Sequence, residues 1–238
     1  MSQELPRPAN LILSSLPEEE YQQLSPYLYP VSLPLGTTLY DAGDKIETVY
    51  FPNETVISLI AILEEGEIAE TALIGKFGII GLPAILGTGY NTEKTIVQVA
   101  DNLMKMSASV LKTQFLKGGE LQRYILLYTE YRMIEINRQS VCNTYHTIEQ
   151  RLARWLLRIQ DLVGSQELFL TQDFIAKMLG VNRSSVTIIA GILQRAGMIS
   201  YSRGKVTILD RVALEDTTCQ CYFFLKQEYE RVLESQFK

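Results

Sequence analysis

Five basic side chains lie between residues 171 and 209, where Asp173 is the only acidic one. The net charge of this stretch, +4, contrasts with the net charge of −5 that the whole 238-residue chain carries at pH 7. A basic patch on an acidic protein is the electrostatic footprint of a surface that binds phosphate groups, as DNA presents them. The five basic residues are Lys177, Arg183, Arg195, Arg203 and Lys205.

Side chains suited to other chemistry are few. The sequence has no phosphate-binding loop, no serine nucleophile elbow and no pair of histidines, which argues against an enzyme. Its three cysteines, Cys142, Cys219 and Cys221, make no even set for a disulfide framework and fall short of the four thiolates that usually hold an iron–sulfur cluster. His146 is the only histidine. We therefore expect no catalytic residue, no metal and no cofactor, and reduced cysteines with a structural role.

Two short helices must position the basic residues. Thr171 and Asn182 are candidate N-caps, and Gly180 between them suits the left-handed turn that ends a helix. Apolar residues recur at helical spacing on both sides of this glycine, at Ile175, Met178, Leu179, Val186, Ile189, Ile192 and Leu193. So tight a turn predicts a helix-turn-helix, whose second helix enters the DNA major groove. An ordinary αα-hairpin would show the same two helices, but the basic segment that follows favours DNA binding.

The stretch resembles the helix-turn-helix of the Crp/Fnr family of bacterial transcription regulators. Ala176 stands where two helices approach closely, Gly180 stands in the turn, and residues 198–208 resemble the family's wing. The resemblance implies that the start of the second helix reads base edges, with Arg183 on guanine. Ser184 and Ile188 stand where many relatives have Glu and Arg, so the usual target sequence should not carry over. The expected base-reading residues are Asn182, Arg183, Ser184, Thr187 and Ile188. The expected phosphate contacts are Thr171, Ser185, Arg203 and Lys205.

The first half of the chain has a different pattern. Short β-type runs at 31–35, 37–40, 48–51, 56–62, 68–74 and 95–100 alternate with turn residues, which indicates a sandwich, barrel or jelly roll. Residues 39–44 and 49–51 look like the start of a cyclic-nucleotide-binding-type β-roll. In that family a Gly-Glu pair binds the ribose and an Arg-Ser pair holds the cyclic phosphate. Here Gly81-Leu82 and Lys94-Thr95 stand at those positions.

This candidate effector site is degenerate. Leu82 cannot accept a hydrogen bond from a ribose hydroxyl, and Lys94 lacks the two-pronged geometry of arginine. We expect that the roll does not bind cyclic AMP in the usual way. A different small-molecule effector and a roll retained only as scaffold remain alternatives.

The region from Lys112 to about Gly164 is helical almost throughout. Leu121, Tyr124, Tyr128 and Tyr131 form a seam at coiled-coil-like spacing, and Ile134, Val141 and Ile148 form a second apolar line. We expect one line to face the roll and the other to meet a second copy, although both could be filled within one chain. The polar run 143–147 is the expected hinge, and Thr147 should cap the next helix.

These patterns predict an α+β fold with an N-terminal β-roll of the double-stranded β-helix or jelly-roll type, a long dimerisation helix and a C-terminal winged helix-turn-helix. The predicted segments are 1–117 for the sensor roll, 118–146 for the long helix and hinge, 147–210 for the DNA-binding domain and 211–238 for a helical extension. The acidic first part and the basic reader fit a sensor joined to a DNA-binding module.

The predicted function is a homodimeric transcription regulator of the Crp/Fnr type that binds a pseudo-palindromic DNA site. The alternative is an effector module, for a cyclic nucleotide or another small molecule, that acts through protein contacts. The resemblance implies double-stranded DNA, a second copy and RNA polymerase as partners, with an unknown small-molecule effector. No apolar run approaches the ~20 residues of a membrane span, so we expect a cytoplasmic protein without a membrane partner.

Overall fold

The computed structural model describes residues 7–237; residues 1–6 of the predicted sensor segment and residue 238 of the predicted extension lie outside the described part. The chain divides into two compact units, which are described separately. The first consists of the described residues within Met1–Ser58, Ile74–Met133 and Glu228–Lys238, and the second of Leu59–Leu73 and Ile134–Gln227. Two elements, the β4–β5 hairpin and helix α5, run through both units.

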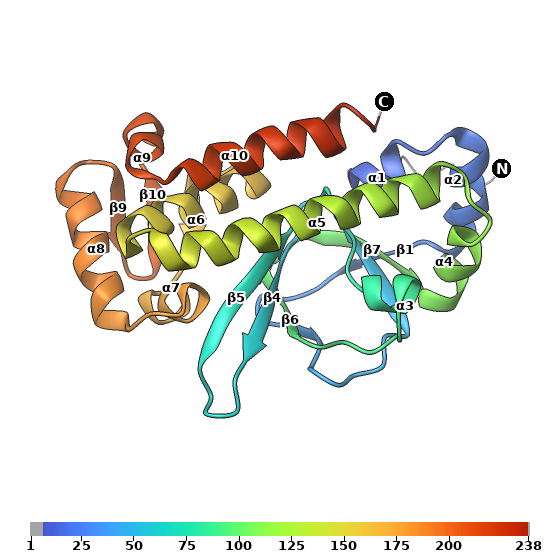
Figure 1. Cartoon of the computed structure of the whole chain (residues 1–238), viewed down its shortest axis with the longest axis horizontal. Coiled ribbons are helices and arrows are strands. Elements are labelled where there is room, and N and C mark those ends of the chain that lie inside the picture. Colours follow the sequence, from blue (N-terminus) through green and yellow to red (C-terminus); the bar gives the residue numbers. More distant parts are fainter. Residues whose placement is uncertain (1–6, 238) are drawn as a thin grey trace. The chain divides into compact units, whose positions relative to one another are not determined.

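The N-terminal part is a β-roll preceded by α1 (Leu11–Ser14), α2 (Glu18–Leu24) and a 3-10 turn η1 (Ser25–Tyr27). One antiparallel sheet has the order β1-β7-β3 and the other the order β2-β6-β4-β5. The predicted roll architecture is confirmed, and Figure 1 shows its strands in blue to green. The seven strands are β1 (Tyr29–Ser32), β2 (Thr38–Tyr40), β3 (Thr48–Pro52), β4 (Val56–Ile62), β5 (Ile68–Ile74), β6 (Lys94–Val99) and β7 (Asn102–Ser107).

The sequence analysis missed β7, which pairs with both β1 and β3 in the centre of its sheet. Its segment, NLMKMS, contains no β-branched or aromatic residue, so its β-propensity is low. Leu103 and Met106 are nevertheless buried, because the two neighbouring strands supply the pairing and the core supplies the apolar contacts. Tertiary context therefore overrides local preference here.

Helix α3 (Leu82–Leu86) lies between β5 and β6, whereas α4 (Ala108–Phe115) and the 27-residue α5 (Gly119–Tyr145) follow β7. The predicted seam of α5 is buried within the first unit. Tyr124 donates its hydroxyl to the Ser15 carbonyl at 3.2 Å, and its ring lies 4.4 Å from the ring of Phe237. The ring of Tyr131 meets that of Tyr229 edge-on. This line of side chains is thus filled by the chain itself.

Helix α5 ends at Tyr145, and α6 (Ile148–Val163) begins two residues after His146. The predicted cap at Thr147 is confirmed as a capping box. Its hydroxyl accepts a hydrogen bond from the Gln150 amide at 3.3 Å, and the Gln150 side chain accepts one from the Thr147 amide at 3.1 Å. The chain direction therefore changes at a well-capped junction inside the second unit.

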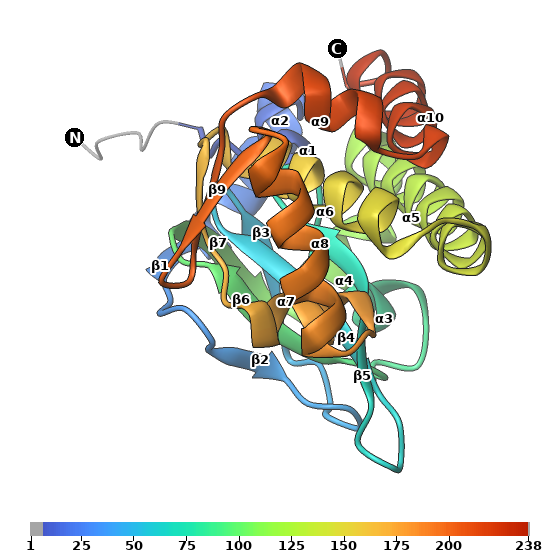
Figure 2. The same cartoon turned by 90° about the vertical axis from the view of Figure 1, so that its left-hand side faces the viewer.

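The second unit also holds a small sheet of order β8-β10-β9 and the two helices of the predicted helix-turn-helix. Helix α8 packs against α7 and against β9, and Figure 2 shows it beside β9. The elements are β8 (Glu167–Phe169), α7 (Gln172–Leu179), α8 (Arg183–Arg195), β9 (Ile199–Ser202) and β10 (Lys205–Ile208).

The helical extension predicted at residues 211–238 is broken into several pieces. Helices α9 (Arg211–Thr217) and α10 (Gln220–Tyr229) are followed by a π-helical turn, η2 (Glu230–Glu234). The break falls at Thr218, whose backbone is extended (φ −72°, ψ 167°). Within the second unit α10 runs beside the C-terminal half of α5 (Figures 1 and 2), where the Arg138 guanidinium lies 3.5 Å from the centre of the Phe224 ring.

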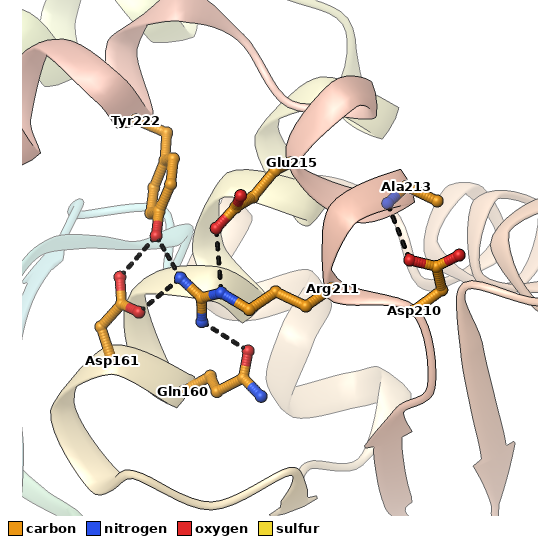
Figure 3. Close-up of polar contacts among 7 residues, drawn as sticks. All are labelled: Gln160, Asp161, Asp210, Arg211, Ala213, Glu215 and Tyr222. Carbon is orange, nitrogen blue, oxygen red and sulfur yellow. Dashed lines mark hydrogen bonds and ion pairs between the residues drawn. The ribbon is translucent and has the colours of Figure 1, made fainter.

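Arg211 joins α9 and α10 to α6, and Figure 3 shows its contacts. Its guanidinium donates to Gln160 at 2.7 Å, to Asp161 at 2.8 Å and to the Tyr222 hydroxyl at 2.6 Å. The Tyr222 hydroxyl donates in turn to Asp161 at 2.8 Å. A half-buried arginine with several charge-assisted contacts of this kind fixes the start of α10 on α6. No helix in the described part of the chain combines the length and apolar character needed to cross a membrane.

Candidate nucleic-acid interface

Local capping fixes the first helix of the reader, by which we mean α7, α8 and the β9–β10 wing; Asn182 stands at the N-cap of α8, but its side chain makes no capping hydrogen bond. The Thr171 hydroxyl accepts a hydrogen bond from the Phe174 amide at 3.2 Å, as predicted for an N-cap. Gly180 closes α7 with φ +62° and donates its amide to the last carbonyls of the helix. A side chain at this φ would strain the turn, so glycine is the residue that permits the sharp change of direction.

The inner faces of α7 and α8 form a tight core. Ile175, Ala176, Leu179 and Val186 are all at most 5% exposed. Ala176, the position expected to allow close approach of the two helices, is buried on α7, which packs against α8. Arg151 of α6 donates to the Leu179 carbonyl at the end of α7, and burial lowers the pKa of this arginine. The core therefore holds α8 rigidly on α6 and α7 and leaves its other face free.

The exposed face begins at the first turn of α8, where four of the five expected base-reading side chains lie exposed together and the fifth, Asn182, lies exposed at the N-cap. Ile188 is 63% exposed, which is unusual for an isoleucine on a helix that packs its apolar face elsewhere. The four on the helix are Arg183, Ser184, Thr187 and Ile188.

Two neighbours on α7 restrain this face, and the sequence analysis missed both. The Arg183 guanidinium lies 3.5 Å from the Asp173 carboxylate, and the Thr187 hydroxyl donates to the Gln172 side chain at 2.7 Å. Both contacts join the first turn of α7 to the first two turns of α8. These partners meet only once the two helices have folded together. Asp173 could have been suspected from the sequence, because it is the single acidic residue in a basic stretch.

The wing turns at Arg203 and Gly204, which have φ of +50° and +78°. Two consecutive positive φ values are typical of the type I′ turn that suits a two-residue hairpin. Arg203 is exposed at this turn. Lys205 is half-buried and lies 2.6 Å from Glu167 of β8, so an acidic neighbour already offsets its charge. Of the remaining phosphate candidates, Thr171 is exposed and Ser185 half-buried.

The arginines on the polar side of α6 are not free phosphate-binding groups. Arg154 is 3% exposed and donates to Gln139 at 2.5 Å, while Arg158 forms an ion pair with the buried Glu135. In the same unit, Trp155 donates its indole N–H to the Glu70 carboxylate at 2.7 Å. Arg154 and Arg158 are therefore committed to contacts within this unit and add no free positive charge to that of the reader.

The four residues of the expected effector site lie on two elements of the first unit. Gly81 (φ +102°) precedes α3, and a Cβ there would lie 3.0 Å from Val49. Leu82 begins α3 and is half-buried. On β6, the Lys94 ammonium lies 3.0 Å from the Asp41 carboxylate, and Thr95 is 1% exposed. The positive charge that would meet a cyclic phosphate is therefore paired with the exposed carboxylate of Asp41.

Comparison with known proteins agrees with this geometry. Residues 150–217 match the family described as the Crp-like helix-turn-helix domain. The global nitrogen regulator of Synechococcus elongatus is 23% identical to this chain, over 75% of this chain and 85% of its own length. The global nitrogen regulator of Nostoc sp. is 26% identical, over 74% of this chain and 83% of its own length. A Crp/Fnr-family transcriptional regulator from Eubacterium rectale has a similar fold, with a TM-score of 0.69, 19% identity and coverage of 87% of this chain and 96% of its own.

The matched segment contains α7, α8 and the whole wing, the elements whose exposed side chains were described above. The rest of the fold, a roll followed by a long helix, is that of the regulator structures. The chain therefore carries a Crp-like helix-turn-helix domain within a fold similar to that of the Crp/Fnr regulators, and it is a DNA-binding transcription regulator.

Proposed function

We propose that this regulator binds a pseudo-palindromic DNA site as a homodimer, with the first turn of α8 from each copy in a major groove. The observation that supports this most directly is the exposed set at the start of α8, which contains one bidentate donor and one large apolar side chain. Arg183 can donate to O6 and N7 of a guanine, and Ile188 can contact a thymine methyl. Asn182, Ser184 and Thr187 complete the base-reading set.

Thr171, Ser185, Arg203 and Lys205 are proposed to contact phosphates and so fix the register of α8 in the groove. Because Ser184 and Ile188 differ from the residues that many relatives use, the preferred site should differ from the usual one of the family. Thymine-rich half-sites with one conserved guanine would suit these side chains.

The second copy is proposed to pack along α5. Apolar side chains on this helix that the chain itself does not cover include Met133, 62% exposed, and Tyr145, 79% exposed. Leu126 and Met133 are seven residues apart, the spacing of a coiled-coil seam. The full set is Leu126, Met133, Ile136, Val141 and Tyr145. A two-fold pair on this helix would place two readers at the separation of successive major grooves, about 34 Å.

The roll is proposed to have lost the usual response to cyclic AMP, because Leu82 cannot bind a ribose hydroxyl and Lys94 is paired with Asp41. A different small molecule would remain the effector, and RNA polymerase would be a partner at the promoter. We assign residues 1–117 to the sensor, 118–146 to the dimer helix, 147–210 to the reader and 211–238 to the extension, in a cytoplasmic protein.

The deciding experiment is a selection of bound duplexes from a random pool, with sedimentation of the protein alone and on the selected DNA. We expect an inverted repeat whose half-sites are one helical turn apart and a sedimenting mass of two chains. A monomeric protein that selects a single unpaired half-site would contradict the dimer and leave DNA binding intact.

A further inference from the structure

All three cysteines and the only histidine of the chain gather at one place in the second unit. The Sγ atoms of Cys142, Cys219 and Cys221 and a ring nitrogen of His146 lie within 4.8 Å of one another. The three cysteines are at most 2% exposed, and His146 is half-buried. Cys142 is separated from Cys219 by 77 positions, so the fold alone assembles this group.

The separations between these atoms suit a single tetrahedral ion. The Cys142 and Cys219 sulfurs are 3.6 Å apart, and Cys221 Sγ is 3.7 Å from His146 Nδ1. With Zn–S bonds of about 2.3 Å and Zn–N bonds of about 2.0 Å, a tetrahedron has edges of about 3.8 Å between sulfurs and about 3.5 Å between sulfur and nitrogen. The remaining pairs, within 4.8 Å, need only a small contraction.

Local structure presents these ligands in two pairs. Cys142 and His146 are four residues apart at the end of α5, where the His146 amide donates to the Cys142 carbonyl at 3.1 Å, so both side chains lie on one face. Cys219 and Cys221 flank Gln220, the first residue of α10. The Arg211 contacts with Asp161 and Tyr222 hold this end of α10 in place. The site is therefore built on helices that other contacts already fix.

The surroundings can balance the charge of such a site. Three thiolates around a divalent cation carry a net charge of −1, which is costly to bury without a nearby cation. Arg154 is 3% exposed and interacts electrostatically with both Cys142 and Cys219. Its Nε is buried and, among the described residues, has no hydrogen-bond partner. Arg138 interacts in the same way with Cys221.

We propose that Cys142, His146, Cys219 and Cys221 bind one structural Zn²⁺ ion in a tetrahedral Cys3His site. On binding, the three thiols lose their protons to solvent and the neutral imidazole donates a lone pair, so no electron is transferred. The ion would join the α5–α6 junction to the start of the C-terminal extension. Its loss would loosen the junction through which α5 positions the reader.

Two other uses of these residues fit the geometry less well. A disulfide needs sulfurs about 2.05 Å apart, well below the 3.6 Å between Cys142 and Cys219. An iron–sulfur cluster places several iron and sulfide atoms between its ligands, which would have to spread apart from their present positions. The space between the four atoms fits one ion.

Metal analysis of the protein purified without added chelator or metal is the first test, and about one zinc per chain is expected. Replacement of zinc by Co²⁺ should give the intense visible bands of a tetrahedral site and a thiolate-to-cobalt charge-transfer band. Cys219→Ser and His146→Gln should lose the bound metal or weaken the charge-transfer band. The exposed neighbour change Asn143→Gln is the matched control and should retain both.

If the variants fail to fold, the proposal can still be tested by thiol reactivity in the unchanged chain. With zinc bound, the three thiols should react slowly with a thiol reagent, and removal of zinc by a chelator should accelerate their reaction at least tenfold. Less than a tenth of an equivalent of zinc, together with no tetrahedral Co²⁺ spectrum after reconstitution, would overturn the proposal. Stoichiometric iron with acid-labile sulfide, or a Cys142–Cys219 disulfide in the protein as purified under reducing conditions, would also overturn it. None of these outcomes depends on DNA binding.

Discussion

The reader and the roll treat their polar side chains in opposite ways. At the start of α8 the candidate base-reading side chains are exposed, and their contacts with α7 are exposed pairs that DNA can replace. On the roll Lys94 is paired with Asp41, Thr95 is buried and Leu82 is apolar. A recognition surface needs donors and acceptors that are positioned but not yet committed. By this criterion the reader is equipped for its ligand and the roll is not equipped for a cyclic nucleotide.

The largest effect should come from a cavity under the reader. Leu193 is fully buried, and Leu193→Ala should lower the free energy of unfolding by about 2–5 kcal/mol and abolish DNA binding. Trp155, the only tryptophan, lies in the second unit and reports this loss by fluorescence. The matched change Leu103→Ala makes a similar cavity in the roll. Equal shifts of the tryptophan transition in both variants would show that the two regions unfold as one.

The next effect concerns sequence reading. Arg183→Ala should cost about 1–3 kcal/mol on the selected site and relax one base position, because a bidentate contact with guanine is lost. Binding to selected and scrambled duplexes by fluorescence anisotropy measures both. Arg195→Ala, which removes an exposed arginine from the other end of α8, is the control and should leave specificity unchanged. A similar loss on both duplexes in Arg183→Ala would mean that this residue reads no base.

A smaller and uniform effect is expected from the wing. Arg203→Ala should weaken binding to all sequences alike and reduce the slope of log K against log salt by about one. Lys205→Ala should change the slope less, since Glu167 already offsets the charge of Lys205 at 2.6 Å. DNA-binding titrations of both variants at several salt concentrations test whether Arg203→Ala changes the slope more than Lys205→Ala does. A greater effect of Lys205→Ala would show that DNA breaks the Glu167 pair.

The smallest effect should be that of cyclic AMP on the unchanged protein. We expect no heat of binding by calorimetry at micromolar concentrations of cyclic AMP or cyclic GMP, for the reasons given for Leu82 and Lys94. The paired measurement is DNA affinity with and without nucleotide, which should not differ. Micromolar affinity would remove the contrast between the reader and the roll.

Local sequence signals predicted much of this structure. Thr171, Thr147 and Gly180 were assignable because caps and left-handed turns depend on neighbouring residues only. Strand β7 could not be assigned from the sequence, because its pairing with β1 and β3 places it in the sheet and its own residues have low β-propensity. The gathering of Cys142 with Cys219 and Cys221 was also out of reach, because the break at Thr218 and the Arg211 contacts decide where α10 begins. The candidate reading surface was predicted, but its partners Gln172 and Asp173 required the folded helix pair.

One consequence follows for anyone who wishes to exchange the reader between regulators. The compact unit that contains it also includes Leu59–Leu73, most of the β4–β5 hairpin, whose Glu70 accepts the Trp155 indole hydrogen bond. A chimera cut only near residue 147 would transplant the tryptophan without its carboxylate acceptor. The transferable module is therefore discontinuous in sequence, and a faithful graft would carry residues 59–73 of the hairpin along with residues 134–227.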